Sequence, residues 1–532
     1  MPWHALIDSL ILSVHAALVP EGTEGTVLMF GGDEHNPRQG GTDEVPATAA
    51  NINRTALYDV ASRQVIRTTS PTTDVFCSGH AFMGDGRLLV AGGTESWGGL
   101  DAGGEGGGHV HQHGNFGGHQ GCWRYNHDQN TWSRAAPLNF DLVQHRGGGR
   151  WYPSLLTLPS GDVVAFGGHP SRRSLNWHHN DIPEHYSPES NRWSWYPNAI
   201  SFEHPTLPGN WYPRITLIPG GRIFITTRHN NRCRFFDPDS GDLVGPVIAG
   251  PPSPYDVGWD YSVIMLPLVP GDGYRARVMA VNGAQPVKIE LNLAPDAPTP
   301  SWENAGTRRG SAAEKTRNFA CPVYLPTGQI LVSGGINGGS ADADAVREPE
   351  IYTPDINWTT RTYGPAPGAW QTLQEPAQVA RNYHTVALLL PDGSVFTASS
   401  SKDAASGDPN VVGQKNIEIF FPPYFNNPGR PALTAAPASL TYDDREFPVS
   451  TGSAAQAAAI RKVALIRCGS VTHAADFDQR YVALGFTHRA GTPDLTVEFP
   501  GDASILPPGN YMLWVVDEND LPCGQARFVQ LR

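Results

Sequence analysis

The chain has 532 residues and a formal net charge of −13, which argues against nucleic acid or an anionic membrane surface as its main partner. Glycine (58 residues) and proline (47) are abundant and only 17% of residues are charged, a composition that favours strands and turns over helices. No apolar run approaches the roughly 20 residues of a membrane span. The apolar segment 6–20 carries Asp8 and lacks a basic start, so it is expected to be strand rather than signal peptide.

Short apolar strands recur along the chain and indicate an internal repeat. They are expected at residues 27–30, 88–91, 163–166, 223–226, 278–281, 330–333 and 395–398, and four of them run directly into a Gly-Gly pair. Turn sequences such as Pro159-Ser160-Gly161 precede them, which indicates hairpins, and outer strand pairs are expected within 122–132, 184–193 and 351–358. Units of roughly 50–75 residues with about four strands each are typical of a kelch-like β-propeller, and seven units predict seven blades.

The repeat stops near residue 430, which predicts two domains. Residues 1–430 are expected to form the propeller. Residues 431–532 contain alternating strands at 462–466, 494–499 and 511–516 and are expected to form an Ig-like β-sandwich. Cys468 and Cys523 both lie in this second domain and could pair, although the sequence alone leaves that pairing open.

One matching position in the repeat holds three chemically different side chains. Cys77, Tyr152 and His384 precede Gly92, Gly167 and Ser399, respectively, by the same number of residues. The first strand of each propeller blade lines the central channel, so these three side chains are expected to meet near the axis. Tyr212, in a Trp-Tyr-Pro sequence like that of Tyr152, holds the same position in the fourth unit. On spacing alone, either Tyr212 or Tyr152 could be the tyrosine of the site.

Four motifs in this order closely resemble those of the copper radical oxidases, the galactose oxidase and glyoxal oxidase family. They are Phe76-Cys77-Ser78-Gly79, Arg150-Trp151-Tyr152-Pro153, Arg381-Asn382-Tyr383-His384 and Ser470-Val471-Thr472-His473. The resemblance covers nearly the whole chain. It implies a seven-bladed propeller followed by a C-terminal early-set domain that supplies one histidine.

The resemblance also implies a metal centre and assigns its residues. Tyr152, cross-linked to Cys77 through a thioether, would be an equatorial copper ligand and would carry a radical. Tyr383 would be the axial ligand and general base, and His384 and His473 would complete the set. Two imidazoles and two phenol oxygens suit Cu(II). The implied reaction oxidises a small alcohol or aldehyde with O2 and releases hydrogen peroxide, in a protein that is expected to be a monomer.

Three features depart from galactose oxidase. His169-Pro170 stands where that enzyme has a tryptophan stacked on the thioether, and Trp97 on the same face could substitute. The glycine-rich segment 103–121, with His109, His111, His113 and His119, is expected either to form an entrance or copper-acquisition loop or to be a loop with incidental histidines. The chain starts at the first blade without a carbohydrate-binding domain, which favours a small aldehyde or simple alcohol over galactose.

Two other function classes remain at this point. A non-catalytic kelch propeller would bind a protein or glycan on its face and need no copper. A copper-binding protein would keep the ligands without oxidising any substrate, since the stacking tryptophan is absent. Tyr212 is interpreted as channel lining or a substrate contact. Relatives work outside the cytoplasm, so the resemblance implies an extracellular or cell-envelope location, although this chain shows no export signal and the cytoplasm stays open.

Overall fold

The computed structural model describes residues 2–31, 55–96, 117–143, 146–171, 180, 182–196, 211–226, 232–252, 261–294, 296–308, 316–338, 342–401 and 413–532. Regular structure in these residues is almost entirely β-strand. The exceptions are one α-helix, Ala454–Ala459 (α1), and the 3-10 turns Pro270–Asp272 (η4) and Asp342–Asp344 (η5). The all-β prediction is therefore confirmed. None of the helices in these ranges is long and apolar enough to cross a membrane.

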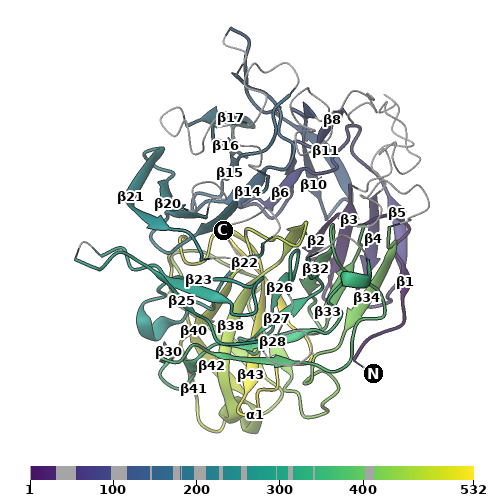
Figure 1. Ribbon diagram of the computed structural model, residues 1–532. Helices are drawn as coiled ribbons and strands as arrows, with labels where there is room; N and C mark the ends of the chain where they lie inside the picture. The colour runs from purple at the N-terminus through teal and green to yellow at the C-terminus, as the bar shows by residue number, and fades with distance from the viewer. Residues whose placement is uncertain are drawn as a thin grey trace.

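The chain before residue 421 folds into consecutive antiparallel sheets that form the propeller (Figure 1). In chain order, the first three sheets contain β2 (His15–Val19), β3 (Thr26–Phe30), β4 (Thr55–Asp59) and β5 (Val65–Thr68); β6 (Gly79–Phe82), β7 (Leu88–Ala91), β10 (Cys122–Asn126) and β11 (Thr131–Ala135); and β14 (Ser154–Thr157), β15 (Val163–Phe166), β16 (Glu184–Ser187) and β17 (Arg192–Trp195). The next two contain β18 (Arg214–Leu217), β19 (Ile223–Thr226), β20 (Arg232–Asp237) and β21 (Asp242–Ala249); and β22 (Val263–Met265), β23 (Arg277–Ala280), β24 (Val287–Glu290) and β25 (Trp302–Asn304). The last two contain β26 (Cys321–Tyr324), β27 (Ile330–Ser333), β28 (Glu350–Thr353) and β31 (Ala369–Thr372); and β32 (Val386–Leu389), β33 (Val395–Ala398), β34 (Asn416–Phe420) and β1 (Ile7–Asp8). Three two-stranded ribbons extend from them, namely β8 (Thr94–Ser96) with β9 (Gly117–Gly118), β12 (Phe140–Asp141) with β13 (Arg146–Gly147), and β29 (Ile356–Asn357) with β30 (Thr362–Tyr363).

The apolar strands expected from the repeat are all present, as β3, β7, β15, β19, β23, β27 and β33. Each pairs antiparallel with the strand just before it in the chain. The first strands of neighbouring sheets contact one another: β6 with β14, β14 with β18, and β32 with both β26 and β2. The first strands therefore lie at the centre, as expected for a propeller, while the number of seven blades stays a prediction.

The N-terminal segment contributes to two sheets. β1 pairs with β34, with Ile7 opposite Ile417, so the start of the chain completes the sheet made by the last repeat (Figure 1). β2 then begins the next sheet. The strand interpretation of segment 6–20 is confirmed for residues 7–8 and 15–19, and the two ends of the repeat are joined by hydrogen bonds.

One predicted outer strand pair is wrong. β28 pairs with β31, and residues 356–357 belong to the separate ribbon β29–β30. Pro354, which has no N–H to donate, follows β28 directly. Asp355 then fixes the inserted ribbon, because its carboxylate accepts the Ala366 N–H at 2.7 Å and its carbonyl accepts the Gly364 N–H at 2.8 Å.

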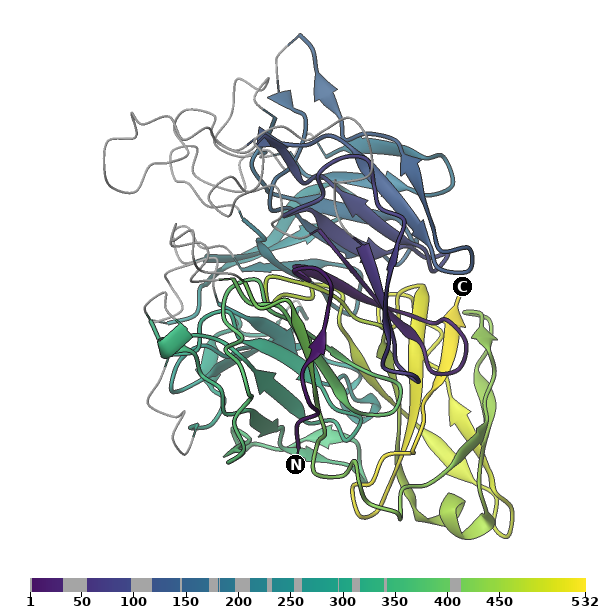
Figure 2. The same cartoon turned by 90° about the vertical axis from the view of Figure 1, so that its right-hand side faces the viewer.

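The C-terminal region forms two packed sheets (Figure 2, yellow-green to yellow). One contains β35 (Leu433–Ala435), β37 (Glu446–Thr451), β42 (Asp494–Glu498) and β41 (Phe486–His488), and the other β36 (Ser439–Leu440), β44 (Arg527–Leu531), β43 (Gly509–Asp517), β38 (Ile460–Arg467) and β40 (Tyr481–Leu484). The three strands predicted here are confirmed as β38, β42 and β43. Cys468 and Cys523 are both free, so the pairing considered for them is not formed.

A short strand from the C-terminal region enters the propeller. β39 (Ser470–Thr472) pairs antiparallel with β2, with Thr472 opposite His15 and Ser470 opposite Ala17. It also contacts β6 and β32. A single apolar cluster is continuous from the propeller sheets into both C-terminal sheets, which holds this strand in place. The residue after β39 is His473, so the C-terminal region delivers that side chain to the centre of the propeller.

Candidate metal centre

A shared backbone bend marks the repeat position that holds Cys77, Tyr152 and His384. Their φ angles are 58°, 67° and 66°, in the left-handed region, and Tyr212 (46°) and Phe319 (58°) adopt it too. Each of the five lies just before the first strand of its sheet. A non-glycine residue in this region costs about 1–2 kcal/mol. The same unfavourable bend in five units confirms that these residues occupy one equivalent position.

The ends of the second strands leave room for this bend. Gly92 (φ 80°) and Gly167 (φ 64°) are themselves left-handed. A Cβ on Gly92 would lie 2.1 Å from the carbonyl oxygen of Arg150, so glycine is required there. Ser399 has a φ of 65°, which confirms it as the counterpart of these glycines in the last sheet.

Buried arginines fix three of the bends, a feature that the sequence analysis missed. Each arginine donates to the carbonyl at the end of the second strand of its own sheet: Arg150 to Gly167 at 2.7 Å, Arg317 to Gly334 at 2.7 Å and Arg381 to Ser399 at 3.3 Å. Each also faces a buried glutamate on the third strand: Arg150 with Glu184 at 2.9 Å, Arg317 and Arg308 with Glu350, and Arg381 with Glu418 at 3.8 Å. These pairs tie the first three strands together directly before Tyr152, Phe319 and the Tyr383-His384 pair.

Five side chains predicted to form the site meet at the centre of the propeller. The Nε2 of His473 lies 3.1 Å from the Tyr152 hydroxyl and 3.6 Å from the Cys77 Sγ. The hydroxyls of Tyr152 and Tyr383 are hydrogen-bonded to each other. The rings of Tyr383 and His384 stack with centroids 3.8 Å apart, and the rings of His384 and His473 are 4.5 Å apart. The structure thus brings together Cys77, Tyr152, Tyr383, His384 and His473.

A hydrogen-bond chain fixes the tautomer of His473. The carbonyl of Val14 can only accept, so the Thr472 hydroxyl, 3.1 Å away, donates to it. That leaves the Thr472 oxygen to accept the Nδ1–H of His473 at 2.6 Å. The Nε2 of His473 therefore carries a lone pair and faces the Tyr152 hydroxyl. Donation through the other ring nitrogen is the usual arrangement of a metal-ligating histidine.

Burial keeps Tyr152 and His473 uncharged when no metal is bound. Burial raises the pKa of Tyr152 well above its ordinary value, and the neighbouring Cys77 adds to this. Burial likewise lowers the pKa of His473 well below its ordinary value, with His384 contributing in the same direction. A neutral imidazole is the form that binds metal, whereas Tyr152 must lose its proton when it becomes a ligand.

The donor set fits Cu(II). Imidazole nitrogens from His384 and His473 and phenol oxygens from Tyr152 and Tyr383 provide the N and O ligands that copper prefers in tetragonal sites. The ligand-type atoms of Cys77, His384 and His473 lie within 4.8 Å of one another, a separation that a single ion can bridge. The Nδ1 of His384 is hydrogen-bonded to Ser401, which orients its ring.

Aromatic rings surround Tyr152 on several sides. Tyr212 lies 4.7 Å from Tyr152 and 4.8 Å from His473, and its hydroxyl donates to the carbonyl of Ser78 at 2.8 Å. The rings of Trp151 and Trp211 lie 4.3 Å and 5.6 Å from that of Tyr152. Sequence reasoning had not assigned these two tryptophans a role, although the repeated Trp-Tyr-Pro sequence was a signal that could have found them.

The remaining predicted neighbours fall partly outside the described residues. His169 is buried and pairs through its backbone with Trp151, with N–H to carbonyl distances of 2.7 and 2.8 Å. Trp97, His109, His111 and His113 lie outside the described residues. His119 is described, and its Nδ1 accepts the N–H of Gly121 at 2.6 Å.

The fold and the centre together define an all-β propeller with phenol, imidazole and thiol groups buried at its axis. Residues 34–424 match the family model described as "Glyoxal oxidase N-terminus", and residues 430–531 match "Galactose oxidase-like, Early set domain". The chain belongs to the galactose oxidase and glyoxal oxidase family of copper radical oxidases.

Individual relatives agree with this assignment. The chain is 24% identical to galactose oxidase of Gibberella zeae (98% of this chain, 69% of that protein) and 28% identical to aldehyde oxidase GLOX of Vitis pseudoreticulata (88% and 83%). It is 25% identical to a WSC domain-containing protein of Arthroderma benhamiae, where the match covers 89% of this chain and 47% of that longer protein. A fungal alcohol oxidase of the AA5 family, solved with copper, has the same fold with a TM-score of 0.73 at 18% identity, covering 99% of both chains.

Proposed function

We propose that this protein is a copper radical oxidase that uses Cu(II) and a thioether between Cys77 and Tyr152. It oxidises a small alcohol to an aldehyde, or a hydrated aldehyde to an acid, and reduces O2 to H2O2. The observation that carries this proposal is the meeting of two phenols, two imidazoles and one thiol at the propeller axis, with the His473 lone pair 3.1 Å from the Tyr152 hydroxyl.

When bound, Cu(II) supplies an open coordination position and one of the two one-electron acceptors that alcohol oxidation needs, and the thioether-modified Tyr152 supplies the other. Tyr383 would be the general base: its oxygen lies beside that of Tyr152, and once Tyr383 has lost its own proton on binding the metal, that oxygen can receive the substrate O–H proton. His384 and His473 would hold the ligand geometry through their imidazole nitrogens, and burial keeps His473 neutral. Substrate loses one O–H and one C–H hydrogen, and O2 gains both as H2O2.

A glyoxal oxidase-like substrate is favoured over galactose. The family model that covers most of the chain is that of glyoxal oxidase, and the relative with the higher identity, at 28%, is named an aldehyde oxidase. The rings of Phe319 and Phe76 lie against Tyr383 and His384, with centroids 5.1 and 5.3 Å apart, and give the centre an apolar wall. We therefore propose that small aldehydes and simple alcohols are better substrates than sugars.

Peroxide release from the copper-loaded protein tests the proposal. Glyoxal, methylglyoxal, glycolaldehyde, galactose and benzyl alcohol are compared, with the variant Tyr152→Phe at the same copper load as control. We expect H2O2 with at least one small aldehyde and none from the variant. Copper uptake without peroxide from any substrate would instead favour a copper-binding protein, and no copper uptake would favour a binding propeller.

A further inference from the structure

The loop that carries His473 is anchored to the propeller on two sides. It comprises residues 473–480 between β39 and β40 and is here called the histidine loop. On one side, the N–H of Ala474 donates to the carbonyl of Thr385, next to His384, at 2.9 Å. On the other side, the loop reaches β14, the strand that follows Tyr152.

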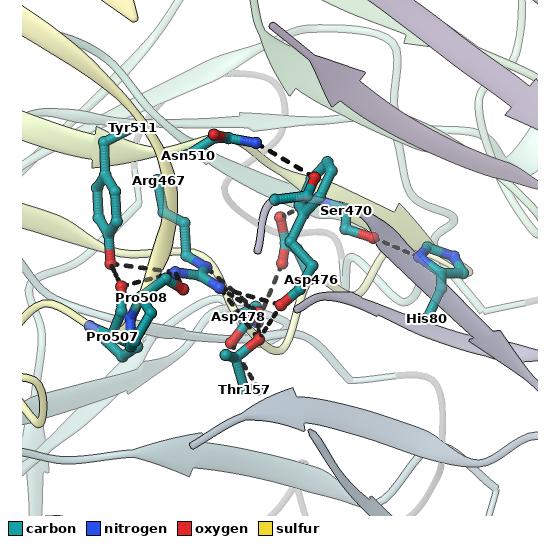
Figure 3. Close-up of polar contacts among 12 residues, drawn as sticks. His80, Thr157, Arg467, Ser470, Asp476, Asp478, Pro507, Pro508, Asn510 and Tyr511 are labelled. Carbon is teal, nitrogen blue, oxygen red and sulfur yellow. Dashed lines mark hydrogen bonds and ion pairs between the residues drawn. The ribbon is translucent and has the colours of Figure 1, made fainter. Parts of the chain in front are cut away.

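A first carboxylate braces the loop internally. Asp476 accepts the N–H of Ser470 at 2.9 Å through one oxygen and the N–H of Asp478 at 3.0 Å through the other (Figure 3). These two bonds join Ser470, the first residue of β39, to the far part of the loop. Consequently, a displacement of Asp478 is transmitted to the strand that ends beside His473.

A second carboxylate joins the loop to the propeller. Asp478 accepts the backbone N–H of Thr157 at 3.1 Å, and its other oxygen lies 2.6 Å from the Thr157 hydroxyl (Figure 3). Thr157 is the last residue of β14, which starts directly after Tyr152-Pro153. Because β14 is paired along its length with β15, it connects the Asp478 contact rigidly to Tyr152.

Arg467 completes this junction. Its Nε and Nη2 lie 3.2 and 3.1 Å from the same Asp478 oxygen, and its Nη1 donates to the carbonyls of Pro507 and Pro508 at 3.1 and 3.0 Å. Burial alone lowers the pKa of Arg467, but Asp478 together with Tyr511 and Tyr442 outweighs this and raises it, so the guanidinium is charged. All three junction residues are buried.

A buried ion pair of this kind adds little net stability, because desolvation offsets the attraction, and its best-attested use is to fix one register. We infer that Thr157, Asp478 and Arg467 are positioning residues that set the place of His473 relative to Tyr152, and so the geometry of the donor set. The consequence for copper rests on the proposed function, but the positioning itself does not.

The variant Thr157→Val tests the inference, because it removes the hydroxyl at constant shape and keeps the backbone N–H. Thr157→Ser is the conservative rescue. Tyr481→Phe is the matched control, since it removes a different hydroxyl, one that donates from β40 to the propeller carbonyl of Pro326 at 3.1 Å. Three quantities are measured for each: the His473 Nε2 to Tyr152 Oη separation in crystals of the metal-free protein, the Cu(II) dissociation constant by chelator competition, and the thermal midpoint.

We expect Thr157→Val to lengthen the separation beyond 3.1 Å and to weaken Cu(II) binding by about tenfold. Thr157→Ser and Tyr481→Phe should keep both wild-type values, even where their thermal midpoints fall. An unchanged separation in Thr157→Val overturns the inference. If the wild type binds no Cu(II), the proposed function fails, and the separation alone still decides whether the junction positions His473.

Discussion

Replacing the glutamate of each buried Arg–Glu pair by glutamine should lower the free energy of unfolding by an amount that differs from pair to pair. Glu350 faces two guanidiniums, Arg308 at 2.7 Å and Arg317, and all three side chains are fully buried. Glu350→Gln therefore leaves two buried cations without a counter-charge. Removing one partner of a buried ion pair costs about 3–5 kcal/mol, and we expect the upper end here.

The glutamates of the other two pairs, Glu184 and Glu418, should cost less free energy of unfolding when replaced by glutamine. Burial alone raises the pKa of Glu350, but Arg317 and Arg308 outweigh it and hold the pKa below its ordinary value. At Glu184 burial outweighs Arg150 and the pKa stays raised, so Glu184→Gln should cost less, about 3 kcal/mol. Glu418 lies 3.8 Å from Arg381, and Glu418→Gln should cost about 1 kcal/mol.

Urea unfolding measures these differences, from the shift of the midpoint multiplied by the common slope. The expected order of destabilisation is Glu350→Gln, then Glu184→Gln, then Glu418→Gln. Equal costs for all three, or a cost below about 1 kcal/mol for Glu350→Gln, would refute the argument that these carboxylates neutralise buried guanidiniums.

Three further outcomes are expected. Burial and Asp478 raise the pKa of Asp476 to about 7. Between about pH 4 and pH 7 the folded protein therefore keeps a proton on Asp476 that the unfolded chain has already lost. Stability should therefore fall by up to about 4 kcal/mol between about pH 4 and pH 7, and Asp476→Asn should remove this part of the pH profile in urea unfolding. His473→Ala should weaken Cu(II) binding at least about 100-fold in chelator competition, since losing only a group bonded to a ligand costs about 10–100-fold. Tyr212→Phe, whose hydroxyl donates to Ser78, should lose about 1 kcal/mol of stability and leave the Cu(II) dissociation constant nearly unchanged.

The hairpins could be predicted because each rests on local chemistry. A short apolar run preceded by a Pro/Asp/Gly turn specifies a buried strand whatever its partners are, and β7, β15 and β33 appear where expected. The bend at Cys77, Tyr152 and His384 could not be read from residue type, because residues other than glycine are uncommon at positive φ. Their equal spacing to Gly92, Gly167 and Ser399 predicted only that the three residues share one position in the repeat.

Features that depend on distant partners were harder to foresee. The pairing of β39 with β2 joins opposite ends of the chain, and a three-residue strand gives no periodicity of its own. The outer strand β31 was missed because the inserted ribbon β29–β30 separates it from β28. The Arg–Glu pairs did leave a signal, since Arg150 and Glu184 are 34 residues apart and Arg317 and Glu350 are 33 apart, one on each side of a Gly-Gly pair.

The most direct test of the proposed centre is a search for the thioether itself. Metal-free protein is incubated with Cu(II) in air, reduced and digested, and mass spectrometry looks for the Cys77 peptide joined to the Tyr152 peptide, two hydrogen atoms lighter than their sum. We expect this linked peptide only after copper, and we expect it to be absent from Cys77→Ser. Two separate peptides after full copper loading would contradict the radical centre and leave a resemblance in fold alone.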